Sequence, residues 1–229
     1  MRPQPLLRAT RPMAASALGF ATLATGVSAV AQAQNTNQDA ISVSQSRTHV
    51  VSGRSALVQG SLRGAKAGSV VALQARRGGK WRTLKLDRTD AGGHYRLRYR
   101  ARRPGSWLVR VRLAGPQAAT ATATPAPTAR PRETVGRLNV YRRAYASWYG
   151  PGLYGGHLAC GGTLTPGTLG VAHKSLPCGT KVTLRYHGRS VRVPVVDRGP
   201  YVGGREFDLT SATKDRLGFR GHGYVLSTR

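Results

Sequence analysis

Apolar and polar residues alternate at every second position through both halves of this 229-residue chain, which favours folds built from half-buried β-strands. The pattern is clear at residues 95–100, where three apolar residues alternate with three arginines, and it recurs at residues 107–113. Because successive side chains of a strand point to opposite faces, one face of each strand should enter a core and the other should carry the arginines. We therefore predict a mainly β protein.

The chain divides at a segment that cannot form a core. Residues 114–135 consist mostly of Ala, Thr and Pro, a composition typical of an extended, solvated linker. Before it, residues 32–113 show several short strands, with a hairpin around Gly78-Gly79, and predict a small immunoglobulin-like β-sandwich. After it, residues 136–229 form a second domain, again rich in strands, with one short helix at residues 210–217.

The first 31 residues have the pattern of a secretory signal peptide. Three arginines precede an apolar run from Met13 to Val30, and small-residue cleavage patterns end at Ala31 and Ala33. The alternative is a transmembrane anchor, although the run is rich in Ala, Thr and Gly and is near the lower length limit for spanning. We predict export to the periplasm or cell wall, without stable membrane insertion after cleavage.

The charge balance points to an anionic partner. The chain has 36 Lys or Arg against 8 Asp or Glu, and residues 32–113 alone carry a net +14. Nucleic acid, anionic lipid and anionic wall polymers all fit this charge. An exported protein rarely meets nucleic acid, so we expect the first module to hold anionic wall polymers and expect no nucleic-acid partner. The alternative for the arginine faces is a solvated surface without a ligand.

The two cysteines, Cys160 and Cys178, are separated by a short loop in a domain that we predict to be exported. A disulfide is the expected state. The alternatives are a metal site that adds His157 and His173, or a nucleophilic cysteine paired with His173. Neither spacing matches a zinc pattern, and we expect no metal and no cofactor.

The second domain has few residues that could supply acid chemistry. Its four carboxylates are Asp197, Glu206, Asp208 and Asp215. Alternation at residues 182–186 and 191–195 predicts a hairpin that places Asp197 just beyond a strand end. Asp-Arg-Gly-Pro is also a good turn sequence, so Asp197 has a purely structural alternative.

Four motifs occur in order in this domain. They are Ala146-Ser147-Trp148-Tyr149-Gly150-Pro151-Gly152, Val171-Ala172-His173-Lys174-Ser175-Leu176-Pro177-Cys178-Gly179-Thr180, Val196-Asp197-Arg198-Gly199-Pro200-Tyr201 and Phe207-Asp208-Leu209-Thr210. Together they resemble the RlpA-like (rare lipoprotein A) family of septal lytic transglycosylases, over residues 145–228 only. The resemblance implies a six-stranded double-psi β-barrel, related to the fold of expansins.

The resemblance also implies a reaction and a site. Family members cleave peptidoglycan glycan strands between N-acetylmuramic acid and N-acetylglucosamine and leave a 1,6-anhydro end. By position, Asp197 matches the catalytic aspartate and His173 its accompanying histidine. Asp208 and Arg198 are expected to bind substrate. Trp148 and Tyr149 are expected to stack on sugar rings, with core packing as their alternative.

One position departs from the family pattern. Family members commonly carry a glutamate between the first two motifs, and Gly162 stands at that place. Two interpretations follow for a secreted, monomeric protein. It is a lytic transglycosylase that relies on Asp197, or it is a noncatalytic, expansin-like module that binds glycan and loosens the wall. A nucleic-acid-binding protein is a third class, supported by charge alone.

Overall fold

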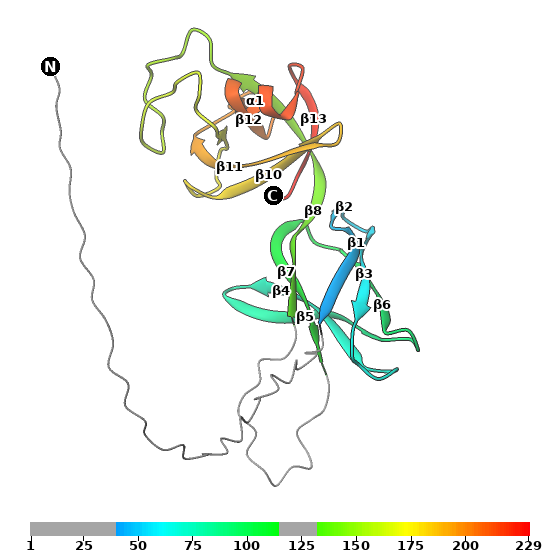
Figure 1. Ribbon diagram of the computed structural model, residues 1–229. Coiled ribbons are helices and arrows are strands. Elements are labelled where there is room, and N and C mark those ends of the chain that lie inside the picture. Colours follow the sequence, from blue (N-terminus) through cyan, green and yellow to red (C-terminus); the bar gives the residue numbers. More distant parts are fainter. Residues whose placement is uncertain (1–39, 115–131) are drawn as a thin grey trace, which may run out of the picture. The chain divides into compact units, whose positions relative to one another are not determined.

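The computed structural model describes residues 40–114 and 132–229, and strands are the main regular structure of both ranges (Figure 1). The predicted signal peptide and residues 115–131 of the predicted linker lie outside the described residues. None of the helices in the described ranges is long and apolar enough to cross a membrane. The strands of the first range are β1 (Ile41–Arg47), β2 (His49–Val51), β3 (Ser55–Leu62), β4 (Val70–Arg77), β5 (Lys80–Arg88), β6 (His94–Arg100) and β7 (Gly105–Leu113). The second range contains β8 (Arg132–Tyr149), β9 (Val171–Ala172), β10 (Lys181–Tyr186), β11 (Arg189–Asp197), β12 (Phe207–Thr210), α1 (Ser211–Leu217) and β13 (Gly223–Ser227).

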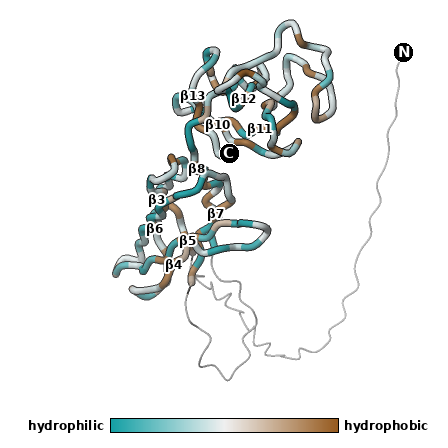
Figure 2. Tube along the Cα trace, turned by 180° about the vertical axis from the view of Figure 1, so that it is seen from behind, coloured by the Kyte–Doolittle hydropathy of each residue, from teal (hydrophilic) through white to brown (hydrophobic). Residues whose placement is uncertain are grey.

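The N-terminal module consists of two groups of strands around one core. One sheet has the order β1-β3-β6, and the other joins β5, β4, β7 and the first part of β8, with β2 paired to β8. Hydrophobic and hydrophilic residues alternate along its strands (Figure 2). The core cluster includes Val58, Leu73, Leu97, Val109 and Leu138. The mainly β prediction is confirmed, and the immunoglobulin-like assignment stays a prediction.

Local stereochemistry explains the strand ends in this module. The β4–β5 hairpin turns at Gly78-Gly79, as predicted, and both glycines have the positive φ that a tight hairpin turn needs. On β6, Tyr95 and Leu97 are buried while Arg96, Arg98 and Arg100 are exposed. The alternation therefore sorts the arginines to one face, as the sequence predicts.

Strand β8 begins earlier than the predicted domain boundary. Composition predicts a linker over residues 132–135, but these residues form the start of this 18-residue strand and pair with β7. These four residues lack the Ala and Pro that dominate the preceding segment, and their backbone groups complete the ladder along β7. The first part of β8 also supplies Leu138 and Val140 to the core of the N-terminal module. Strand pairing of that module thus continues past residue 136.

The C-terminal domain is a closed ring of six strands. The second part of β8 pairs with β13, which pairs with β10, and the order continues through β11, β9 and β12 back to β8. The β12–β8 and β11–β9 pairs are parallel, and the other pairs are antiparallel. A separate core cluster fills this ring, with Leu184, Phe207, Leu209 and Leu217 fully buried. Closure removes free sheet edges and fixes which residues of β9, β11 and β12 face one another.

The predicted short helix is present as α1, between Thr210 and Gly218. Thr210 accepts a hydrogen bond from the Thr213 amide at the N-terminus of α1, and Gly218 ends the helix in the left-handed conformation. The helix follows β12 directly and buries Leu217 in the core of the barrel.

Candidate functional site

Strand pairing places two of the four carboxylates of the barrel on either side of one residue. Ala172 of β9 pairs with Asp197 of β11 on one side and with Asp208 of β12 on the other. Ala172 and Asp208 are directly paired and share a face, whereas a register shift interrupts the β11–β9 ladder between Val195 and Asp197. Both carboxylates raise the pKa of the Tyr149 phenol, so the two side chains lie near the same hydroxyl. Two strand spacings separate their Cα atoms by about 10 Å. Residues 11 positions apart in sequence thus form one candidate site.

Asp197 ends β11 with one carboxylate oxygen bound and the other free. Its Oδ1 accepts hydrogen bonds from the backbone amides of Ala159 at 2.9 Å and Arg198 at 2.8 Å. Its Oδ2 accepts none from the described residues. The structural interpretation of this aspartate therefore accounts for one oxygen, and the other oxygen can give or take a proton.

The Tyr149 hydroxyl is buried next to the two aspartates. It makes no hydrogen bond with any described residue. Burial raises the pKa of Tyr149, and the charges of Asp197 and Asp208 raise it further. Asp197 contributes more to this shift than Asp208, so the hydroxyl lies close to the Asp197 carboxylate although it forms no hydrogen bond with it. It is therefore part of the buried surroundings of the site.

Trp148 lies on the other side of β8. Its side chain packs against the barrel core, and the Lys214 ammonium of α1 lies 4.0 Å from its ring centroid. Because side chains alternate along a strand, Trp148 points away from the face that carries Ser147 and Tyr149. The structure thus places Trp148 in the core-packing arrangement, apart from the two aspartates.

Asp208 is held by its neighbour on β8. Its Oδ1 accepts a hydrogen bond from the Ser147 hydroxyl, and Arg205 Nη1 lies 3.4 Å from the same hydroxyl oxygen. Ser147 and Asp208 are direct partners in the β12–β8 ladder. Cross-strand pairing therefore orients this carboxylate.

The His173 ring is held in one tautomer. Its Nδ1 accepts hydrogen bonds from the Ser175 and Leu176 amides, at 3.1 and 3.0 Å, so the proton of the neutral ring is on Nε2. Burial lowers the pKa of His173, while Glu206 opposes this shift and nearby cations add to it. His173 is thus a neutral N–H donor at neutral pH, and its side chain packs against Phe207 with ring centroids 5.0 Å apart.

Glu206 is a functional candidate that the motif comparison did not single out. His173 Nε2 lies 3.9 Å from Glu206 Oε1, and Arg142 of β8 binds the same carboxylate through both terminal nitrogens. Glu206 is one of only four carboxylates in the sequence of this domain, but the sequence does not show which residues contact it. The pairing of strands in the closed barrel brings Arg142, Glu206 and His173 together.

Arg198 makes its contacts within the protein. Its Nη1 donates to the carbonyl oxygens of His173 and Leu176, at 3.2 and 2.9 Å, and its Nη2 lies 3.2 Å from Cys178 Sγ. These contacts position the loop that carries His173. The predicted substrate role of Arg198 would have to use its remaining donors.

The predicted disulfide between Cys160 and Cys178 is present, with Cα atoms 5.4 Å apart. A bonded pair can serve neither as a nucleophile nor as metal ligands, so both cysteine alternatives are excluded for this oxidised state. The described residues contain no group of three or more His, Cys, Asp or Glu side chains that could hold a metal ion. The Cys160 amide donates to Val196 at 3.1 Å, so the disulfide loop lies beside the end of β11.

The loop that lacks the family glutamate has an unusual backbone. Gly161 and Gly162 have φ values of +92° and +84°, a conformation that side chains with a Cβ rarely adopt. A glutamate at position 162 would therefore be strained in this loop. Glycine is the residue that the local backbone favours.

Comparison with known proteins identifies the barrel. Residues 141–226 match a double-psi β-barrel family described as lytic transglycolase, which confirms the predicted barrel fold. The chain is 44% identical over 80 residues to a "Probable endolytic peptidoglycan transglycosylase RlpA" of Synechocystis, covering 34% of this chain and 25% of the relative. It is 43% identical over 74 residues to the "Endolytic peptidoglycan transglycosylase RlpA" of Campylobacter jejuni, covering 31% and 27%. The matches thus span about a quarter of each relative.

A solved structure, "Streptomyces papain inhibitor (SPI)", is also similar, at 25% identity and a TM-score of 0.31. The matched region covers 38% of this chain and 90% of the inhibitor. At that TM-score the likeness carries no argument about function.

Proposed function

Because residues 141–226 belong to the RlpA-like family of lytic transglycosylases, we propose that this protein is an endolytic peptidoglycan transglycosylase. The observation that carries the proposal is the state of Asp197. This carboxylate has one oxygen held by two backbone amides and the other free, at a motif position that matches the family's catalytic aspartate. Asp208, on the other side of Ala172, can bind the hydroxyl groups of a sugar.

The proposed reaction needs one acid rather than a carboxylate pair. Protonated Asp197 donates its proton to the glycosidic oxygen as the bond from the anomeric carbon of N-acetylmuramic acid to that oxygen breaks. The 6-hydroxyl of the same muramic acid forms a new bond to the anomeric carbon, and its proton passes to the Asp197 carboxylate. The products are a free hydroxyl on N-acetylglucosamine and a 1,6-anhydro end. No water is consumed, unlike in hydrolysis by an ordinary glycosidase.

His173 and the cluster around it are proposed to orient the substrate. With Nδ1 occupied by two amides, only Nε2–H is available to donate a hydrogen bond. A neutral donor of this kind suits a sugar hydroxyl or an N-acetyl carbonyl oxygen. Tyr201, which is 81% exposed and four residues after Asp197, offers an aromatic face for sugar stacking.

Gly162 supports a second candidate function. If the family glutamate is the indispensable proton donor, its replacement leaves a noncatalytic, expansin-like module that binds glycan without cleaving it. The left-handed backbone at this position disfavours a glutamate, so glycine is the residue that suits this loop. The two candidates differ in one measurable property, the formation of anhydro ends.

Export and the anionic partner belong to the same proposal. The relatives are named as peptidoglycan transglycosylases, and peptidoglycan lies outside the cytoplasmic membrane. We place this protein in the periplasm or cell wall, as a monomer whose basic N-terminal module holds anionic wall polymers. The net charge of +14 on residues 32–113 supports that part of the proposal.

The test is digestion of purified, peptide-free glycan strands by the full chain, followed by mass spectrometry. Products with 1,6-anhydro ends are expected from the wild type and not from Asp197→Asn. Asp215→Asn is the matched control, because Asp215 is the exposed carboxylate of α1 that pairs with Lys214. Reducing ends without anhydro ends would indicate hydrolysis, and intact strands that remain bound would favour the noncatalytic candidate.

A further inference from the structure

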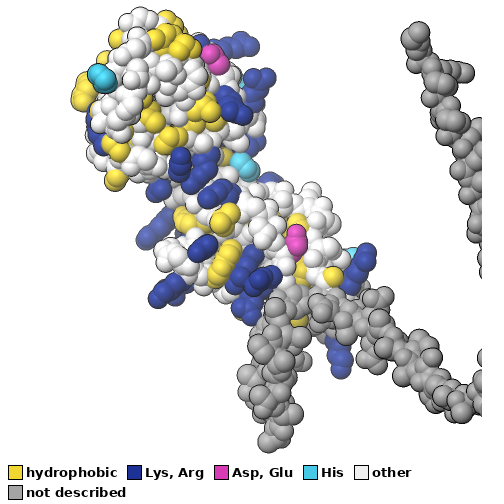
Figure 3. Space-filling view, turned by 60° about the vertical axis from the view of Figure 1, so that its left-hand side comes forward, with side chains coloured by type: hydrophobic (Ala, Val, Ile, Leu, Met, Phe, Trp, Pro, Cys, Tyr) yellow, Lys and Arg dark blue, Asp and Glu magenta, His cyan; other side chains and the backbone are white. Residues whose placement is uncertain are grey.

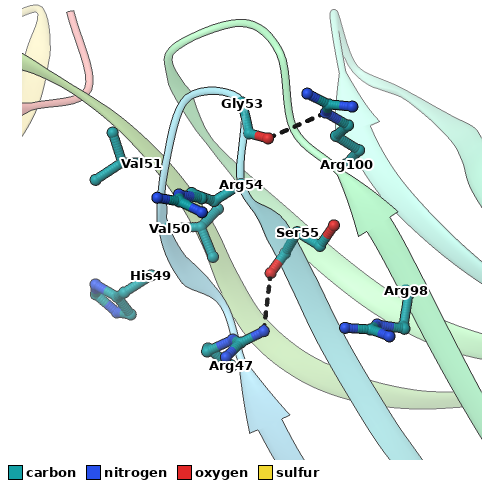
Figure 4. A pocket seen from close by; sticks show the side chains of 9 residues that line it. All are labelled: Arg47, His49, Val50, Val51, Gly53, Arg54, Ser55, Arg98 and Arg100. Carbon is teal, nitrogen blue, oxygen red and sulfur yellow. Dashed lines mark hydrogen bonds between the residues drawn. The ribbon is translucent and has the colours of Figure 1, made fainter.

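A hollow of about 600 Å³ in the N-terminal module is lined by four arginines (Figure 4). Arg47 comes from the end of β1, Arg54 from the turn after β2, and Arg98 and Arg100 from β6. No carboxylate lines it. The arginine face that alternation predicts for β6 is therefore concentrated, at this point, around a concave surface.

Two of these arginines brace the hollow and two are free. Arg47 Nη2 donates to the Ser55 carbonyl oxygen at 3.3 Å, and Arg100 Nε donates to the Gly53 carbonyl oxygen at 3.1 Å. These contacts use one nitrogen of each guanidinium. The Arg54 and Arg98 guanidinium groups make no hydrogen bond with a described residue, so their donors are available to a ligand.

The positive charge in the hollow has no compensation from the described parts of the chain. All salt bridges among the described residues lie in the barrel, and none involves an arginine of the hollow. The Asp87 and Asp90 side chains accept hydrogen bonds from the backbone amides of Arg96 and His94. Figure 3 shows many Lys and Arg side chains and few Asp and Glu on the face in view. Like charges gathered in this way repel one another, and a bound anion would relieve the repulsion.

The chemistry of the donors selects the anion. Guanidinium groups bind phosphate oxygens through paired N–H donors, and a phosphate group can accept from several arginines at once. A carboxylate has two oxygens and can be satisfied by a single arginine. Guanidinium groups from three separate segments of the module therefore suit a phosphate better than a carboxylate.

We propose that this hollow is a phosphate-binding site, and that its ligand is a phosphodiester group of an anionic wall polymer. The choice of polymer rests on the proposed function, which places the protein at the wall. The phosphate chemistry rests on the hollow itself. The N-terminal module would thus hold the polymer by a specific site rather than by its net charge alone.

The test measures binding of a defined poly(glycerol phosphate) to the full chain, with Arg54→Gln/Arg98→Gln as the variant. Neither side chain braces the hollow, so the variant removes donors without breaking an internal hydrogen bond. Affinity should fall about tenfold or more. The matched control is Arg63→Gln/Arg96→Gln, which removes the same charge from exposed arginines that do not line the hollow. The control should lose no more than about threefold, through the general field.

Further measurements separate the sources of the anion. Inorganic phosphate should compete with the polymer, and polygalacturonate of matched charge should bind at least about tenfold more weakly. An equal loss in both variants, or equal binding of the carboxylate polymer, would overturn the site. Binding to phosphatidylglycerol vesicles without binding to the polymer would overturn the polymer as its source.

Glycan cleavage distinguishes this proposal from the proposed function. The Arg54→Gln/Arg98→Gln variant should cleave soluble, peptide-free glycan as fast as the wild type. If the wild type cleaves no glycan but the variant still loses polymer binding, the proposed function fails and the phosphate site stands.

Discussion

Replacing Asp197 by Asn and by Ala separates its chemical role from its structural role. Oδ1 accepts two backbone hydrogen bonds, from exposed Ala159 and half-buried Arg198. Ala removes both acceptors. At roughly 1 kcal/mol for each bond in these partly solvated positions, Asp197→Ala should lower the free energy of unfolding by about 2 kcal/mol.

Asp197→Asn keeps an oxygen that can accept from both amides, but the oxygen is uncharged. Since charge-assisted hydrogen bonds are about twice as strong as neutral ones, the loss of stability should be about 1 kcal/mol. The amide cannot give a proton to the leaving oxygen. Formation of anhydro ends should therefore fall by about a hundredfold or more, while glycan binding is retained.

The assay pairs mass spectrometry of anhydro products with denaturant unfolding of the oxidised protein. Asp215→Asn should keep wild-type activity. Turnover by Asp197→Asn above about a tenth of the wild type would refute the acid role. Equal destabilisation by Asn and Ala would refute the hydrogen-bond argument, because it would mean that the amide does not replace the carboxylate as an acceptor.

Three further predictions concern the surroundings of this aspartate. Burial lowers the pKa of His173, so the folded state binds its proton less readily than the unfolded state. This contribution to stability should therefore be lost as pH falls below the ordinary histidine pKa of about 6.5. NMR titration should give a pKa below that value and a still lower pKa in Glu206→Gln, and an unchanged pKa in that variant would contradict the contact between Glu206 and His173. Replacing both Cys160 and Cys178 by Ser should lower the free energy of unfolding by roughly 3 kcal/mol, measured by denaturant titration, because the bond closes a loop across 18 positions; wild-type stability of the double variant would count against it. Tyr149→Phe should leave the free energy of unfolding unchanged or raise it by up to about 1 kcal/mol, because the buried hydroxyl has no partner to lose; a loss of more than about 1 kcal/mol would show that the hydroxyl makes a stabilising hydrogen bond.

Much of the local structure could be predicted because it depends on residues close together in sequence. Alternation identified the strands and sorted the β6 arginines to the exposed face. Gly78-Gly79 predicted the β4–β5 turn, and the helix expected at residues 210–217 is present as α1. The matched motifs identified the barrel family.

Other features depend on which strands become neighbours. The contact between Glu206 and His173, and the placement of Asp197 and Asp208 on either side of Ala172, follow from strand pairing across the closed barrel. The sequence contained these residues but not the register that joins them.

Patterns in the sequence were enough to predict the mainly β character, the position of the helix, the disulfide partners and the motif that contains Asp197. Those features follow from side-chain alternation, capping chemistry and the small number of cysteines. Long-range packing was needed to show that β8 contributes to both the N-terminal module and the barrel, that Trp148 packs on the core side, and that four arginines surround one hollow. The reason is that a one-residue change of register moves every side chain of a strand to the opposite face, and register is set by packing between distant segments.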